Sequence, residues 1–167
     1  TARLPWLLIG MIGGIGNSMI LGNFDSTFAT HPEMALYIPL IGGTGGNVGT
    51  QSSAIVVQGL ANSSLDAKNT FKQVTKEAVV ALINATIISL LVYTYNFIRF
   101  GATATVTYSV SISLFAVVMF ASIFGTLVPM TLEKLKIDPA IATGPFIAIT
   151  NDIIGMMLYM GITVLLS

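Results

Sequence analysis

Long apolar segments, separated by short polar gaps, impose the main constraint on how this chain can fold. There are five of them, at residues 5–22, 34–61, 74–98, 106–132 and 139–166. A helix that crosses a bilayer needs about 20 mostly apolar residues, and each segment approaches or exceeds that length. Only 8% of the residues are charged, whereas a soluble domain carries about 25%. The sequence therefore predicts an all-α, polytopic membrane protein with five transmembrane helices per subunit.

The basic residues in the polar gaps predict how the helices are oriented. Lys68, Lys72 and Lys76 lie between the second and third segments, and Lys134 and Lys136 lie between the fourth and fifth. Short cytoplasmic loops carry an excess of Lys and Arg. Both gaps are therefore predicted to face the cytoplasm, which places the N-terminus inside and the C-terminus outside. The predicted location is the cell membrane, as a multi-pass protein.

Charge and residue usage exclude several classes of function. The seven basic and seven acidic residues cancel, so no bulk charge favours nucleic acid as a partner. The sequence has no cysteine, which excludes a disulfide, a thiolate metal site and a redox centre built on thiols. A single histidine, His31, excludes a histidine-rich metal cluster. We do not expect an enzyme.

The second apolar segment carries a glycine-rich run, which reads PLIGGTGGNVGTQ over residues 39–51. Glycine disfavours a helix, and irregular backbone inside a bilayer persists only against protein or a wet cavity, so we predict a break in the helix here. Asn47 and Gln51 are four residues apart, on one helical face, with Thr44 and Gln58 near that face. Amides at membrane depth could bind water or an ion's water shell. Alternatively, the glycines and amides serve helix packing and interhelical hydrogen bonds.

Asp152 lies near the centre of the fifth segment, 139–166. A charge at that depth costs at least roughly 2.5–3.5 kcal/mol, and such residues commonly mark an ion or substrate path. Gly144, Ala148 and Gly155 share its helical face, at spacings of four, four and three residues. The pattern predicts a narrow stripe of small residues around one carboxylate.

Three interpretations of Asp152 compete. Pairing with a buried base is disfavoured, because every Lys and Arg lies near a segment end. A protonated structural group or a proton relay is the second. The third, which we favour, is a water-filled cation path. Ca²⁺ needs six to eight oxygen ligands, whereas Mg²⁺ usually keeps several waters and needs few protein oxygens. In a symmetric dimer, two copies of Asp152 would supply two charges to one divalent ion.

The run PLIGGTGGNVGTQ, together with DPAIATGPFIAITNDIIG in the last segment, resembles the membrane domain of the MgtE family of magnesium channels and transporters. The resemblance implies a homodimer in the lipid bilayer with a pore along its interface, and Mg²⁺ as the transported ion bound in that pore. It implies metal contacts from Asp152 and from the backbone carbonyl of Ala148, with Gly43, Asn47 and Thr50 lining the path. Many family members carry Asn at the position of Thr50, so this chain departs from the pattern there.

The resemblance also implies that residues 1–167 form a single transmembrane pore domain, without the cytosolic N-terminal and CBS regulatory domains of the family. Two other functions stay open at this point. One is a proton- or sodium-coupled cation carrier, and the other is a non-transporting membrane assembly subunit. The choice between channel and carrier, and the ranking of Mg²⁺, Mn²⁺, Co²⁺ and Ca²⁺, also stay open.

Overall fold

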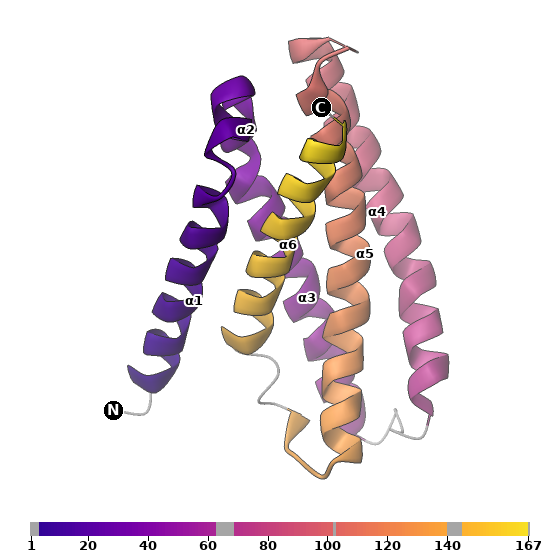
Figure 1. The fold of residues 1–167 in the computed structure, drawn as a ribbon. Coiled ribbons are helices and arrows are strands. Elements are labelled where there is room, and N and C mark those ends of the chain that lie inside the picture. Colours follow the sequence, from indigo (N-terminus) through magenta and orange to yellow (C-terminus); the bar gives the residue numbers. More distant parts are fainter. Residues whose placement is uncertain (1–3, 63–68, 102, 140–144, 167) are drawn as a thin grey trace.

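The computed structural model describes residues 4–62, 69–101, 103–139 and 145–166. Within these ranges the chain is helical and contains no strand, which confirms the prediction of an all-α fold (Figure 1). Its elements are α1 (Leu4–Gly22), α2 (Asp25–Thr30), the 3₁₀ helix η1 (Pro32–Tyr37), α3 (Ile38–Ala61), α4 (Thr70–Phe100), α5 (Thr105–Lys134) and α6 (Pro145–Leu166).

Among the described residues, three helices are long and apolar enough to cross a membrane, judged by length and composition. They cover Thr70–Phe100, Thr105–Lys134 and Phe146–Leu166, and α1 adds a shorter apolar helix at Leu7–Gly22. The face of α4 turned away from the bundle is apolar and exposed at Val79, Leu82, Ile83, Ile87, Leu90 and Leu91. Such a surface suits contact with lipid tails, and it supports a membrane protein.

Helix α3 corrects one prediction, because it runs without a break through the glycine-rich run. Close packing of helix backbones explains why. An ideal Cβ atom built on Gly125 of α5 would lie 2.6 Å from the Gly49 carbonyl oxygen, and one on Gly45 would lie 2.8 Å from Val117 Cγ1. Only glycine allows the helices to approach this closely, so packing offsets its poor helix propensity.

Helix α5 forms the centre of the bundle, with α3 and α6 on one side and α4 on the other (Figure 1). It contributes many of the buried apolar side chains. The main buried cluster joins α5 to η1, α3 and α6 through Met34, Tyr37, Ile41, Val106, Val110, Leu114, Val117, Met156, Tyr159 and Met160. Helix α1 lies at the edge of the bundle and packs mainly on α6, and its Leu21 contacts the buried cluster.

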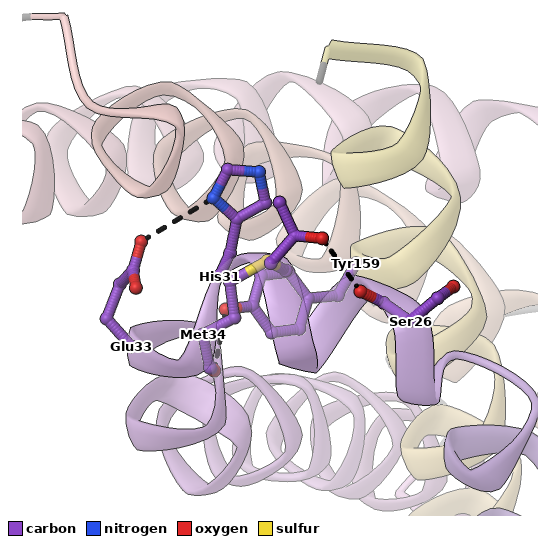
Figure 2. A network of polar contacts seen from close by, with 6 residues as sticks. Ser26, His31, Glu33, Met34 and Tyr159 are labelled. Carbon is purple, nitrogen blue, oxygen red and sulfur yellow. Dashed lines mark hydrogen bonds and ion pairs between the residues drawn. The ribbon is translucent and has the colours of Figure 1, made fainter.

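The polar contacts of η1 hold the segment between α1 and α3 against the bundle. The Tyr159 hydroxyl of α6 donates a hydrogen bond of 2.8 Å to the Met34 carbonyl oxygen, and the Tyr37 hydroxyl donates to Asn96 Oδ1 of α4. His31 Nδ1 lies 3.8 Å from Glu33 Oε1. Figure 2 shows the Tyr159 side chain close to Met34, with His31 and Glu33 nearby. These contacts hold η1, and therefore the beginning of α3, against α4 and α6.

Some predicted features fall partly on residues that the structure does not describe. The predicted fifth apolar segment begins at residue 139, and the described helix α6 begins at Pro145. Gly144, one member of the predicted stripe of small residues, lies outside the described residues, as does Lys68.

Candidate functional site

A cavity of about 470 Å³ lies between α1, α3 and α6. All five residues predicted to contact or line a metal path, Asp152, Ala148, Asn47, Gly43 and Thr50, are among its lining residues. The remaining lining residues are Asn17, Ile38, Pro39, Gly42, Gly46 and Met156. The structure thus brings two motifs that lie about one hundred residues apart in the sequence onto a single cavity.

Helical spacing explains which side chains line the cavity. On α6, Ala148, Asp152 and Met156 recur every four residues, and residues three or four apart lie on the same face of a helix. Gly43 and Asn47 have the same spacing on α3. Residues of α3 and α6 therefore face the same space, although Gly155 of the predicted small-residue stripe packs toward Val117 and Ile41 instead. The role of the lining residues in binding a metal is addressed below.

The Asp152 carboxylate lies close to the α3 backbone, across from the glycine-rich run. An ideal Cβ atom on Gly42 would be 3.6 Å from Asp152 Oδ1. The Asp152 residue itself is half-buried. A larger side chain at position 42 would occupy the space in front of the carboxylate, so the glycine keeps that space open.

The polar side chains of the cavity include two carboxamides, Asn17 and Asn47, which can donate or accept, and two groups that act as acceptors, Thr50 and Asp152. Thr50 Oγ1 lies 2.9 Å from the Gly46 carbonyl oxygen and 3.1 Å from the Asn47 carbonyl oxygen, so its hydroxyl proton is directed to the backbone of its own helix. Its oxygen lone pairs remain available. An ionised Asp152 accepts only. Among the described residues no Lys or Arg lines the cavity, and this argues against pairing of Asp152 with a buried base.

The carboxylates of one chain are too few to enclose a bare cation. The described residues hold no group of three or more His, Cys, Asp or Glu side chains that could hold a metal ion. A hydrated ion needs fewer ligand atoms from the protein, because water supplies the others. Six waters occupy roughly 180 Å³ at about 30 Å³ each, and the cavity of about 470 Å³ has room for them. The arrangement fits an ion that keeps much of its water, as Mg²⁺ does.

Two polar residues show where sequence reasoning is incomplete. Gln51 shares a predicted helical face with Asn47, yet it is exposed and does not line the cavity. Asn17 is absent from the predicted site, and it contributes the polar side chain that α1 brings to the lining. Its sequence signal is a carboxamide inside the mostly apolar segment 5–22. The contact between α1 and α6 that aims it at the cavity has no signature in the sequence.

Asn151, next to Asp152, lies on a different face of α6. It is 1% exposed, and neither its side-chain oxygen nor its side-chain nitrogen has a hydrogen-bond partner among the described residues. An ideal Cβ atom on Gly49 would collide with Asn151 Nδ2. Asn151 therefore fills a tight crossing of α3 and α6 rather than the cavity.

Comparison with known proteins finds similar sequences over nearly the whole chain. Residues 38–162 match the MgtE family, described as a divalent cation transporter. The chain is 33% identical over 160 residues to the magnesium transporter MgtE of Bacillus subtilis, an alignment that covers 96% of this chain and 35% of that relative. It is 32% identical over 165 residues to the magnesium transporter MgtE of Thermus thermophilus, covering 99% of this chain and 36% of the relative. The chain thus spans about a third of the length of these curated relatives.

Proposed function

The chain belongs to the MgtE family of divalent cation transporters, and we propose that it passes divalent cations, Mg²⁺ first, across the cell membrane. The observation that supports this most directly is the cavity in which Asp152 faces the glycine-rich run of α3. The family description names the class of cargo, and the cavity offers it a carboxylate with neutral oxygens around it.

In the proposed mechanism the ion enters the cavity with most of its water shell. Asp152 supplies the charge that attracts it. The Ala148 carbonyl, the Asn47 side chain and the Thr50 oxygen accept hydrogen bonds from the bound waters, and Gly43 leaves room for the shell. A unit charge 4 Å from a carboxylate gains about 4 kcal/mol at an effective dielectric constant of 20, and a divalent ion gains roughly twice as much. Divalent ions are therefore favoured over monovalent ones.

We further propose that α1, α3, α4, α5 and α6 each cross the membrane, with the N-terminus inside and the C-terminus outside. Residues 1–167 then act as one pore domain. The basic residues Lys134 and Lys136, at and just beyond the end of α5, support this orientation. Helix α3 contains glycines and amides that lower its hydropathy, and a helix of this kind is tolerated in a membrane where it lines a wet cavity.

A homodimer with the pore along its interface completes the proposal. One chain offers a single carboxylate to the cavity from its described residues, and a second copy related by a two-fold axis would double the negative charge near the ion. Symmetric pairs are the commonest oligomers of soluble proteins, and a pore on the axis is the arrangement in which both copies of Asp152 act on one ion.

The test is a liposome flux assay across Mg²⁺, Mn²⁺, Co²⁺ and Ca²⁺ with wild type, Asp152→Asn and Asp25→Asn. Asp25 is an exposed carboxylate at the start of α2 and serves as the matched control for loss of one charge. We expect Asp152→Asn to lower Mg²⁺ flux at least about tenfold, which corresponds to about 1.4 kcal/mol, and Asp25→Asn to leave it unchanged. Unchanged flux in a folded Asp152→Asn protein would refute the proposal. Flux that collapses with the proton gradient alone would favour a coupled carrier.

A further inference from the structure

We propose that the N-terminal half of α4 is a binding surface for an anionic phospholipid, with the lipid phosphate at Lys72 and Lys76 and an acyl chain along the apolar stripe that follows them. The inference goes beyond the proposed function, because it concerns a face of the protein away from the cavity. It requires that α4 lies in a bilayer, and this helix is long and apolar enough to cross one.

Two lysines and a stripe of apolar side chains share one face of α4. Lys72 and Lys76 are exposed and lie about one helical turn apart. At spacings of three and four residues the same face continues with exposed apolar side chains, at Val79, Ile83, Ile87 and Leu90. The opposite face carries the buried Ala81 and Ala85, and α4 packs mainly on α5. The lysines and the stripe therefore point away from the bundle.

The described residues do not neutralise these two lysines. Neither Lys72 nor Lys76 has an ion pair or a hydrogen bond from its side chain to a described residue. Glu77 is next to Lys76 in the sequence, but it accepts a hydrogen bond of 3.1 Å from Ser52 Oγ of α3. Its carboxylate is thus turned toward the bundle, and the two ammonium groups are left for a negatively charged ligand.

The base at the other end of α4 differs in this respect. Arg99 Nη1 donates a hydrogen bond of 3.1 Å to the Tyr95 hydroxyl oxygen, and the Arg99 guanidinium carbon lies 5.1 Å from the centre of the Phe100 ring. Arg99 therefore has partners within its own helix, whereas the two lysines have none among the described residues.

The distance along the helix matches one phospholipid. Ile87 is eleven residues beyond Lys76, or roughly 16 Å at a rise of 1.5 Å per residue. The hydrocarbon of one leaflet is about 15 Å thick, half of the bilayer core. A lipid with its phosphate at the lysines would therefore cover the stripe as far as Ile87. The apolar stems of the lysines can lie along the stripe while their ammonium groups reach the headgroup.

The position of α4 favours lipid over a second copy of the chain as the occupant. Helix α5 lies between α4 and α6, and Asp152 of α6 faces the cavity (Figure 1). In the proposed homodimer both copies of Asp152 lie near the two-fold axis, so α4 lies on the outer side of each subunit. Of the lipids that meet this side, an anionic one is favoured, because basic residues near the membrane surface attract negatively charged headgroups.

The experiment is native mass spectrometry of the full chain in detergent, with phosphatidylglycerol and phosphatidylcholine of identical acyl chains added in equal amounts. The variants are Lys72→Gln/Lys76→Gln and the matched control Lys134→Gln/Lys136→Gln, which removes two exposed charges at and just beyond the end of α5. We expect wild type and the control to retain phosphatidylglycerol in preference. We expect this preference to fall at least about tenfold in Lys72→Gln/Lys76→Gln.

Three results would overturn the inference. They are an unchanged preference in folded Lys72→Gln/Lys76→Gln, an equal loss in the control, and a wild type that retains both lipids equally. If the double variant does not fold, Lys76→Gln decides alone, with about a fivefold loss expected and an unchanged preference contradicting the inference. None of these results alters the proposed function, which the Mg²⁺ flux assay tests separately.

A second measurement identifies the occupant of the stripe. The sequence has no cysteine, so Ile83→Cys introduces a unique thiol on the exposed face of α4. We expect no disulfide-linked dimers when this variant is oxidised in liposomes, because lipid covers the face. Linked dimers would show that a second copy of the chain occupies it, and the lipid surface would then be wrong.

Discussion

Asp152 and Asn151 are neighbours on α6, yet their surroundings differ completely. Asp152 is half-buried and faces a cavity that has room for a hydrated ion. Asn151 is 1% exposed, sits against Gly49 of α3 and has no hydrogen-bond partner among the described residues. Successive residues on a helix differ in direction by about 100°. A polar residue at membrane depth therefore indicates a functional site only when its side chain meets a space that a ligand can enter.

The glycine-rich run of α3 is divided in the same way. Gly42, Gly43 and Gly46 line the cavity and leave space in front of Asp152. Gly45 and Gly49 instead allow close approach, where an added Cβ atom would meet Val117 and Asn151. One run of sequence thus keeps a cavity open on one face and permits tight helix packing on the other.

The largest expected effect on the free energy of unfolding comes from comparing a new carboxylate at position 151 with the loss of the carboxylate at position 152. Asn151→Asp would place an uncompensated charge in a closed crossing, and we expect it to lower the free energy of unfolding by roughly 3–5 kcal/mol. Asp152→Asn should change this free energy little, because its side chain already faces a cavity. Reversible unfolding in mixed micelles measures both. Equal stability of the two variants would remove the distinction between the two sites.

Adding a methyl group to the two kinds of glycine gives the next largest effect. Gly49→Ala would collide with Asn151 Nδ2, and overpacking of this kind costs about 1–3 kcal/mol of unfolding free energy. Gly46→Ala is the matched control, since an added Cβ atom there meets nothing within 4 Å. We expect the control to be as stable as wild type or slightly more stable. Thermal unfolding of both variants checks this, and a tolerated Gly49→Ala would contradict the tight crossing.

Tyr159→Phe tests a buried contact farther along α6. The variant loses the hydrogen bond to the Met34 carbonyl oxygen, and we expect a loss of about 1 kcal/mol. Tyr108→Phe is the control, because Tyr108 is exposed on α5. Thermal unfolding again supplies the measurement. A Tyr159→Phe protein as stable as its control would show that η1 is held by other contacts.

Gly42→Ala is the smallest change and acts on the cavity alone. The added methyl group would lie 3.6 Å from Asp152 Oδ1, at ordinary contact distance. We expect unaltered stability and about threefold weaker Mg²⁺ binding, or ~0.6 kcal/mol, because the methyl group displaces water from the carboxylate. Titration with Mg²⁺ measures this. Unchanged affinity would mean that the ion approaches Asp152 from another side.

The long helices are predictable because hydrophobic length is a strong local signal. The predicted segments 74–98 and 106–132 fall inside α4 and α5. Asp152 and Ala148 are predictable as one face, since spacing along a single helix decides it. Their meeting with Asn47 and Gly43 on another helix is expected from the family resemblance, and it does not follow from periodicity.

What the sequence could not reveal depends on contacts between helices. The predicted break in α3 is wrong, because local propensity is overridden by packing at Gly45 and Gly49. Asn17 escapes prediction, because its level relative to Asp152 depends on the contact of Gly13 with Ile149. Register between two apolar helices is determined by the shapes of several side chains together, and no single residue records it.

Tyr159 lies two helical turns beyond Asp152, and its hydroxyl holds the Met34 carbonyl oxygen. The held segment continues directly into Ile38 and Pro39, which form part of the cavity rim. The hydrogen bond thus links α6, which carries Asp152, to the segment that leads into α3. A rotation of α6 about its own axis would therefore have to break this hydrogen bond or shift the beginning of α3.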